Sequence, residues 1–400
     1  MKYIVILCDG AADTPVAELG GKTPLEAAKK PNIDGLAAKG EVGMVTTVPA
    51  NLPPGSDVAN LAVFGYDPQK YYTGRSPLEA MSMGVHLELS DTTFRTNVVT
   101  LSDEENYEDK TMVDYSSDEI TTEESAQLIA AVNEALRTEE YEFFSGISYR
   151  HLLVWHNKEN KFELTPPHDI SGRCVKDYLP KDETILNLMK KSYEILKNHP
   201  VNLDRIKRGL NPANSIWIWG NGTKPALDTY KEKFNLQGTV VSAVDLIKGI
   251  GVCAGLENVD VIGATGNVHT NFDGKAEAAV KALRGGSDFL YVHLEAPDEA
   301  GHRHEIENKV KAIELIDEKI VAPILKALEE DGEDFAMLIM PDHPTPLAIR
   351  THTSDPVPYI IYKSGKNIES GVSSYTEAEA LKTGVTVEHG YTLIERLTSN

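Results

Sequence analysis

The sequence predicts an α/β protein with a doubly wound, mostly parallel sheet and a smaller inserted α+β domain. Two observations predict the sheet: short, wholly apolar runs alternate with amphipathic stretches, and this alternation occurs at both ends of the chain. Strands that are apolar along their whole length are typical of parallel sheets covered by helices on both faces. A middle segment of different character, over residues 91–210, predicts the insertion. The larger domain is then expected to comprise residues 1–90 and 211–400.

The expected strands are uninterrupted apolar runs bounded by Gly, Pro, Asp or Asn. They are KYIVILCDG near the start of the chain, then NSIWIWGNG, GTVVSAVD, VDVIGATG, FLYVHLE, FAMLIMPDH and VPYIIYK. Helical spacing predicts one helix over 23–40 with a stop at Gly40, and others near 223–234, 245–256, 274–284 and 305–330. Pro323 is expected to kink the last of these.

The inserted segment contains its own strands and helices. FRTNVVT and HLLVWHN read as strands, and a Lys-rich helix is expected around 183–197. Thr121, with Glu124 three residues later, predicts the N-terminus of another helix. This mixture is typical of an α+β domain.

Composition excludes several classes of partner. The formal charge of −22 and the isoelectric point near 5.0 argue against binding to nucleic acid or to an anionic membrane. Three cysteines far apart in the chain (Cys8, Cys174, Cys253) are typical of a reduced, cytoplasmic protein. Asp9 interrupts the first apolar run, so we expect a buried strand there rather than a signal peptide. A homo-oligomer is compatible with this composition.

Residue types that bind metals follow several predicted strands. In parallel sheets, ligands bind beyond the carboxyl ends of strands. One hydroxyl, three carboxylates and three imidazoles are enough for two divalent cations and one nucleophile. The seven residues are Asp9, Ser56, Asp298, His302, Asp342, His343 and His352.

Taken singly, each of these residues has a simpler explanation. Ser56 before an apolar run is typical of a helix N-cap. Asp298 and His302, four residues apart, are commonly a solvated pair on a helix surface. The joint occurrence at strand ends favours the metal site.

Longer motifs carry a resemblance to a known family. LCDGAAD, KPNIDGLAAKG, PPGSDVANLAVFGYDP, YYTGRSPLEAMSMGV, APDEAGH, MPDHPTP and THTSDPVP together resemble cofactor-independent phosphoglycerate mutases of the archaeal type, within the alkaline phosphatase superfamily. The resemblance implies one metal held by Asp9, Ser56, Asp342 and His343, and a second held by Asp298, His302 and His352. The chain departs from the family's pattern at Ser76 and His269.

The resemblance also implies an activity. Ser56 would take the phosphoryl group of 3-phosphoglycerate and return it to form 2-phosphoglycerate, a step of glycolysis and gluconeogenesis, without bisphosphoglycerate. Two divalent cations would assist, with Mn²⁺ expected first and Mg²⁺, Zn²⁺ or Co²⁺ also suited to these ligands. The inserted domain would close over the substrate. The candidate substrate-binding residues are Arg75, Arg150, His168, Asp169, Arg173 and Lys275.

Two other functions use the same residues. A metal-dependent phosphomonoesterase would share the serine and the metals but would admit water. A non-catalytic binding module would keep the metals for structure alone. The insertion favours the mutase, because a mutase needs a lid and a hydrolase needs an open path for water.

Overall fold

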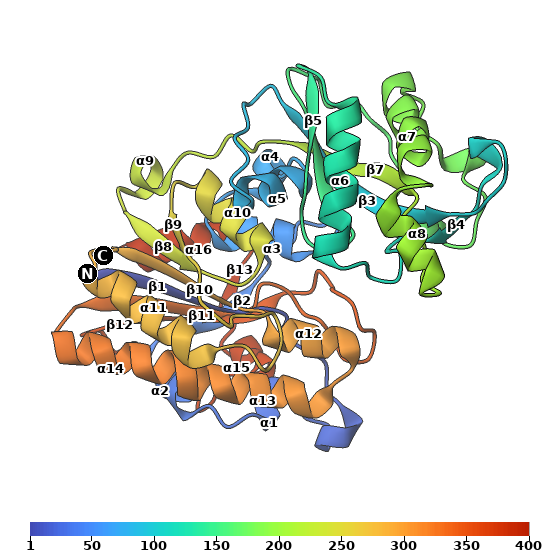
Figure 1. Ribbon diagram of the computed structural model, residues 1–400. Helices are drawn as coiled ribbons and strands as arrows, with labels where there is room; N and C mark the ends of the chain where they lie inside the picture. The colour runs from blue at the N-terminus through green and yellow to red at the C-terminus, as the bar shows by residue number, and fades with distance from the viewer. Residues whose placement is uncertain (400) are drawn as a thin grey trace. The chain divides into compact units, whose positions relative to one another are not determined.

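The structure is a computed structural model that describes residues 1–399. The chain forms two compact units, Met1–Tyr72 with Ala226–Asn400, and Thr73–Pro225, hereafter unit 1 and unit 2. Unit 1 is a sheet with helices on both faces, and unit 2 has a separate antiparallel sheet (Figure 1). The predicted fold class is confirmed.

The sheet of unit 1 has eight strands in the order β13-β2-β12-β11-β1-β10-β8-β9. The strands are β1 (Lys2–Cys8), β2 (Glu41–Val45), β8 (Gly238–Val241), β9 (Glu257–Val259), β10 (Phe289–Leu294), β11 (Phe335–Met340), β12 (Val357–Lys363) and β13 (Thr386–Val387). β11, β1, β10, β8 and β9 are parallel neighbours, whereas β12 runs antiparallel to β11 and β2. The central strands are buried along their length, as their continuous apolar sequences require.

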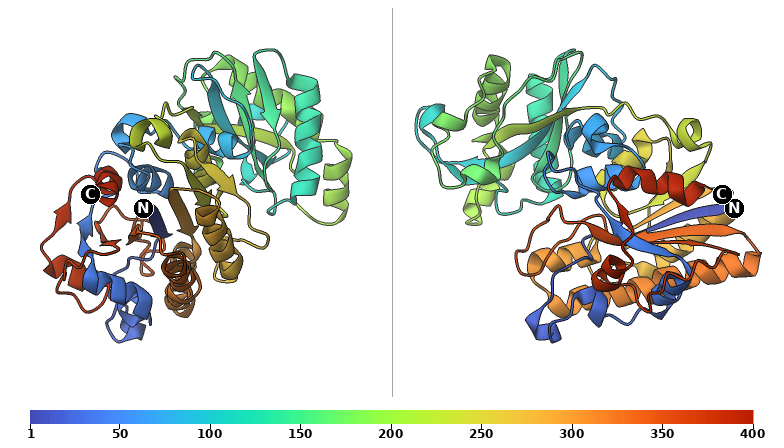
Figure 2. Two further views of the ribbon diagram at one scale, coloured as in Figure 1. Left: turned by 90° about the vertical axis from the view of Figure 1, so that its left-hand side faces the viewer. Right: turned by 180° about the vertical axis from the view of Figure 1, so that it is seen from behind.

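Helices cover both faces of this sheet. Figures 1 and 2 show α2, α11, α13 and α14 on one face, and α3, α10 and α16 on the other. The helices of unit 1 are α1 (Pro24–Ala27), α2 (Pro31–Lys39), α3 (Ser56–Val63), α4 (Pro68–Tyr71), α9 (Tyr230–Phe234), α10 (Asp245–Cys253), α11 (Phe272–Arg284), α12 (Ala296–Arg303), α13 (Ile306–Ile316), α14 (Ala322–Asp331), α15 (Glu377–Lys382) and α16 (Leu393–Thr398). Over residues 1–399, every helix is too short or too polar to cross a lipid bilayer.

The single helix expected over 23–40 is two helices. Thr23 and Glu26 form a reciprocal capping box that starts α1, which ends at Ala27. Pro31 opens α2, and the residue before a proline is disfavoured in helical conformation, so the chain breaks there. Gly40 ends α2 as predicted.

The helix expected over 305–330 contains a π-helical segment, Asp317–Val321, between α13 and α14. This segment ends two residues before Pro323, where a kink was expected. It directs the buried Asp317 carboxylate to the start of α2, where the backbone N–H of Ile33 donates to it at 2.7 Å. Through Asp317, the π-helical segment is therefore hydrogen-bonded to α2, on the same face of the sheet.

The prediction of a strand over VDVIGATG was wrong beyond its first residue, Val259. β9 ends at Val259, and Ile262 is 93% exposed. Gly263 follows with a φ of 76°, a left-handed conformation that interrupts an extended strand. Apolar residues alone did not distinguish this turn from a buried strand.

Unit 2 is an α+β unit built on an antiparallel sheet. Its strands are β3 (Thr92–Leu101), β4 (Met112–Asp114), β5 (Tyr141–Phe144), β6 (Arg150–Trp155) and β7 (Ser215–Thr223), and its helices are α5 (Ser76–Ser82), α6 (Thr122–Leu136), α7 (Glu183–Leu196) and α8 (Pro200–Lys207). β3 pairs with β4, β6 and β7. Thr121 caps α6 as expected, since its side chain accepts the backbone N–H of Glu124.

Unit 2 extends beyond the expected residues 91–210 at both ends. β7, the run NSIWIWGNG that was expected in the larger domain, pairs with β3 and buries Ile216 and Ile218 in the core of unit 2. Before β3, Ser76 of α5 hydrogen-bonds to Thr93, with its Oγ 3.1 Å from the carbonyl oxygen. These long-range pairings add the flanking segments to the unit.

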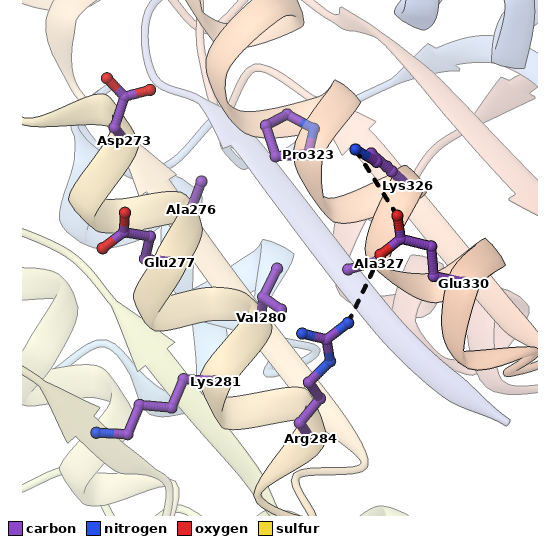
Figure 3. A pocket seen from close by; sticks show the side chains of 10 residues that line it. All are labelled: Asp273, Ala276, Glu277, Val280, Lys281, Arg284, Pro323, Lys326, Ala327 and Glu330. Carbon is purple, nitrogen blue, oxygen red and sulfur yellow. Dashed lines mark ion pairs between the residues drawn. The ribbon is translucent and has the colours of Figure 1, made fainter.

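A groove of about 630 Å³ lies between α11 and α14 (Figure 3). Its floor includes Ala276, Val280 and Ala327, and charged side chains line its edges. Glu330 pairs there with Lys326 at 3.7 Å and with Arg284 at 3.9 Å. The candidate metal clusters found among residues 1–399 lie outside this groove.

A buried ion pair fixes the segment that follows β11. Lys309 Nζ lies 2.7 Å from Asp13 Oδ2, and both side chains are fully buried. Lys309 Nζ also donates to the Thr345 carbonyl at 2.7 Å, and the Leu347 N–H donates to Asp13 at 3.1 Å. The pair thus joins α13, the residues after β1 and the residues after β11.

Replacing Lys309 by methionine should lower the free energy of unfolding by about 3–5 kcal/mol, because it leaves the Asp13 carboxylate buried without a counter-charge. Urea unfolding followed by circular dichroism measures this loss. R284A, which removes an exposed pair with Asp331, is the matched control and should cost far less. Equal losses in the two variants would contradict a stabilising role for the buried pair.

Candidate active site

Three adjacent strands end at the candidate site. Asp9 directly follows β1, Asp342 lies two residues after β11, and Asp298 lies in α12, just beyond β10. Because β11, β1 and β10 are parallel neighbours, their carboxyl ends meet at one edge of the sheet. The topology therefore gathers residues that are hundreds of positions apart in the chain.

The first cluster consists of Asp9, Asp342 and His343, with Ser56 beside it. His343 Nε2 lies 3.4 Å from Asp342 Oδ2, 3.7 Å from Asp9 Oδ1 and 3.1 Å from Ser56 Oγ. The two carboxylates and the imidazole are buried. Their ligand atoms are close enough to hold one metal ion.

Ser56 does not cap its helix. The N-cap of α3 is Gly55, without a side-chain cap bond, and Ser56 is the first helical residue. The N-cap interpretation of Ser56 was therefore wrong. Its hydroxyl faces His343 instead, at the N-terminal end of α3, where backbone N–H groups favour a bound anion.

The second cluster consists of Asp298, His302 and His352. His302 Nε2 lies 3.2 Å from Asp298 Oδ2 and 2.9 Å from His352 Nε2, and His352 Nε2 lies 3.4 Å from Asp298 Oδ1. The rings of His343 and His352 are 4.1 Å apart, and His343 also groups with Asp298 and His352 as a candidate metal site. The two clusters are therefore contiguous, with His343 between them.

The electrostatics of the site favour a cation. Burial, followed by the charges of Asp342, Asp298 and Glu295, raises the pKa of Asp9 well above its usual value. Asp9 Oδ1 is buried and has no hydrogen-bond donor among the described residues. A divalent ion would satisfy this oxygen and offset the repulsion between carboxylates, so the donor set fits a metal.

Two polar residues that the sequence did not single out support the first cluster. Asn60 Nδ2 donates to Asp342 Oδ2 at 2.8 Å and to the Ser56 carbonyl at 2.9 Å, and Asn60 Oδ1 accepts from Tyr291 at 2.6 Å. His293 Nε2 lies 2.8 Å from Asp9 Oδ2. Burial lowers the pKa of His293 to about 3, so the neutral ring donates to Asp9. A histidine within the apolar run FLYVHL was the available signal.

Lys275 is the one candidate substrate-binding residue in unit 1. It lies on α11, and its Nζ donates to the carbonyl oxygen of His293 at 3.3 Å. Burial lowers its pKa to about 8, while the nearby Glu295 carboxylate opposes this shift. The ammonium group of Lys275 therefore contacts the backbone of His293, the β10 residue whose side chain contacts Asp9.

The other five candidates lie in unit 2, where two of them surround a residue that the sequence analysis missed. Arg95 stacks on the Trp219 ring at 4.4 Å. Burial lowers the pKa of Arg95, the Glu79 carboxylate raises it, and the charges of Arg75 and Arg150 lower it further. Glu79 also pairs with Arg75 at 2.9 Å. The result is a cluster of guanidinium groups, Arg75, Arg95 and Arg150.

The three remaining candidates lie near the Pro-rich turn. The ring of His168 is 5.3 Å from that of Trp219, on which Arg95 stacks. Asp169 lies 3.6 Å from His168. Arg173 donates to the Tyr178 hydroxyl at 3.2 Å. Trp219 thus contacts both His168 and Arg95 of the guanidinium cluster, whereas Arg173 is hydrogen-bonded to Tyr178.

A serine hydroxyl beside two carboxylate–imidazole clusters has the composition of a two-metal phosphoryl-transfer centre. The comparisons with known proteins narrow this class. A family model of 2,3-bisphosphoglycerate-independent phosphoglycerate mutases matches residues 37–202. The enzyme of that name from Methanosarcina acetivorans is 49% identical over 388 residues, 96% of each chain, and that from Methanothrix thermoacetophila is 45% identical over 400 residues, 99% of each.

Solved structures agree over the whole chain. A Pyrococcus horikoshii protein has a TM-score of 0.83 at 29% identity, covering 100% of this chain and 98% of that one. The cofactor-independent phosphoglycerate mutase of Thermoplasma acidophilum has a TM-score of 0.71 at 27% identity, covering 99% of both. The chain belongs to the family of 2,3-bisphosphoglycerate-independent phosphoglycerate mutases. The family expected from the sequence is confirmed.

His151, the neighbour of Arg150, belongs to the core of unit 2. It lies opposite Thr96 in the β3–β6 pair, and its Nδ1 accepts the backbone N–H of Gly146 at 3.0 Å. Burial lowers its pKa to about 3. The ring therefore stays neutral in the folded protein when an unfolded histidine, with a pKa of about 6.5, already binds a proton.

Acid should destabilise the protein in part through His151. As the pH falls from about 6.5 toward 3, the unfolded state gains a proton that the folded state does not, so the free energy of unfolding falls by up to about 1.4 kcal/mol per pH unit. H151Q should reduce this slope in urea unfolding between pH 7 and pH 5. H86Q, at an exposed histidine, is the control. Equal slopes in both variants would exclude the contribution of His151.

Proposed function

We propose that the protein interconverts 3-phosphoglycerate and 2-phosphoglycerate through a phosphoserine at Ser56, without bisphosphoglycerate. The observation that carries this proposal is the position of the Ser56 hydroxyl, which is 3.1 Å from His343 Nε2. The names of the relatives at 45–49% identity supply the substrate class. We place the reaction in glycolysis and gluconeogenesis.

Two divalent cations complete the site in this proposal. Asp9, Ser56, Asp342 and His343 would hold one, and the three residues of the second cluster, Asp298, His302 and His352, would hold the other. Bound cations supply positive charge that lowers the pKa of a hydroxyl and neutralises phosphoryl oxygens. Mn²⁺ is the first choice, and Mg²⁺, Zn²⁺ and Co²⁺ also suit this mixture of oxygen and imidazole ligands.

The residues of the chain then have defined tasks. Ser56 Oγ attacks phosphorus in line, so that the Ser56 O–P bond forms while the bond to the 3-oxygen breaks and that oxygen takes a proton. The 2-hydroxyl of the retained glycerate next attacks the phosphoserine and restores Ser56. The N-terminal end of α3 favours the anionic phosphoserine. Lys275, with a pKa of about 8, is mostly protonated at pH 7 and adds positive charge beside His293, which contacts Asp9.

Unit 2 supplies the groups that bind the substrate's charges in this proposal. Guanidinium groups form paired hydrogen bonds with carboxylates and phosphates, which suits Arg75, Arg95 and Arg150. His168, Asp169 and Arg173 remain candidates for contacts with the glycerate hydroxyls and carboxylate. Closure of unit 2 over the substrate would exclude water while glycerate reorients, and would thereby separate a mutase from a phosphomonoesterase with the same serine.

Replacing Ser56 by alanine should lower kcat by more than about 10³-fold, because it removes the hydroxyl that accepts the phosphoryl group in this proposal. The folded protein should keep its stability, since Ser56 does not cap α3. An enolase-coupled assay and thermal unfolding measure the two effects, with S90A in unit 2 as control. Aryl phosphate hydrolysis faster than isomerisation in the unmodified protein would identify a hydrolase instead.

Removing divalent metal should abolish isomerisation. After dialysis against a chelator, activity should return with Mn²⁺, and the number of Mn²⁺ ions bound per chain should reach two. Metal content measured by mass spectrometry on the same samples tests both statements. Activity that persists in protein shown to be free of metal would contradict the proposal.

A further inference from the structure

Thr345 contacts both metal clusters with one hydroxyl group. Its Oγ1 hydrogen-bonds to Asp298 Oδ1 of the second cluster. The same oxygen lies 3.3 Å from His343 Nδ1, the ring nitrogen on the opposite side from Ser56 and the first cluster. Thr345 is fully buried, and it follows His343 by two residues in MPDHPTP.

The surroundings of Thr345 leave its side chain little freedom. A Cβ added at Gly10 would lie 2.6 Å from Thr345 Oγ1, and one added at Gly301 would lie 2.9 Å from its Cγ2. The backbone is held as well, since the carbonyl accepts from Lys309 at 2.7 Å and the N–H donates to Ala12 at 3.3 Å. The hydroxyl is therefore fixed between the clusters by packing on both sides.

The chemistry of the two neighbours assigns the protons. In the proposed site Asp298 binds a cation as an ionised carboxylate, and the oxygens of a carboxylate can only accept hydrogen bonds. The single hydrogen of the Thr345 hydroxyl must then point to Asp298. What remains on Oγ1 are lone pairs, and these accept a hydrogen from His343 Nδ1.

A proton on Nδ1 leaves the lone pair of His343 on Nε2. That nitrogen is the one that lies near Asp9, Asp342 and Ser56. A neutral imidazole binds a metal through its unprotonated nitrogen, and the hydrogen bond made by the other nitrogen fixes which one that is.

We infer that Thr345 is a positioning residue that couples the two metal clusters. Its hydroxyl fixes the tautomer of His343 for the first cluster and the orientation of the Asp298 carboxylate for the second. The inference rests on the proposed two-metal site. It extends that proposal by assigning a single side chain to both ions.

The variant T345V keeps the shape of the side chain and removes the hydroxyl. Calorimetric titration of the metal-free protein with Mn²⁺ should show both sites weakened by about 10- to 100-fold. T345S retains the hydroxyl and should bind within a few-fold of the unmodified protein. T353V is the matched control, because Thr353 is next to His352 but its buried Oγ1 has no hydrogen-bond partner among residues 1–399. It should not change either affinity.

A second measurement reads the tautomer in the unmodified protein, and a variant serves only to assign the signal. Nitrogen NMR of histidine-labelled, unmodified protein should show His343 with its proton on Nδ1, with the signal assigned by its loss in H343Q. Weakening of both sites in T345V, reversed in T345S, together with this tautomer, supports the inference. Equal metal affinities in T345V and the unmodified protein, or a proton on His343 Nε2, would overturn it. Unmodified protein that binds no Mn²⁺ would instead end the two-metal proposal itself.

Discussion

The site depends on the parallel pairing of β1 with β10 on one side and β11 on the other. Six residues of β1, from Tyr3 to Cys8, are in register with β10, and six, from Lys2 to Leu7, with β11. These pairings place three strand ends side by side, and each is followed within a few residues by an aspartate. The middle of β1 is fully buried at Ile4, Val5, Ile6 and Leu7. A shift in register would disrupt the packing of these side chains, and it would also move the carboxylates apart.

Gathering Asp9, Asp342 and Asp298 in a buried place is unfavourable by itself, because like charges and desolvation both oppose ionisation. Hydrogen-bond donors from three separate elements contact these carboxylates. Asn60 of α3 donates to Asp342, His293 of β10 to Asp9, and Thr345 of the segment after β11 to Asp298. These donors leave Asp9 Oδ1 unsatisfied. A cation bound there would favour the folded state, since the unfolded chain does not assemble the ligands.

Sequence predicted those features of the fold and site that are local. A buried apolar run followed by Asp is visible in the chain, so the ends of β1 and β11 and the seven candidate ligands could be named. The limits of unit 2 were not visible, because they depend on the pairing of β7 with β3. Likewise, the contact of Ser56 with His343 and the contacts of Asn60 and Arg95 are made with partners distant in the sequence, which the local sequence does not show.

In the proposed function, the guanidinium cluster of unit 2 would offset the conflict between the negative charge of the chain and an anionic substrate. A net charge of −22 repels phosphate esters at long range. Locally, the guanidinium groups of Arg75, Arg95 and Arg150 lie close enough to interact, and Glu79 pairs with Arg75 at 2.9 Å and with Arg95 at 3.2 Å. Stacking on Trp219 holds Arg95 in place before any ligand arrives, so less side-chain entropy is lost on binding. In the proposed function, the buried and stacked Arg95, together with Arg75 and Arg150, would therefore attract a small dianion against the field of the whole protein.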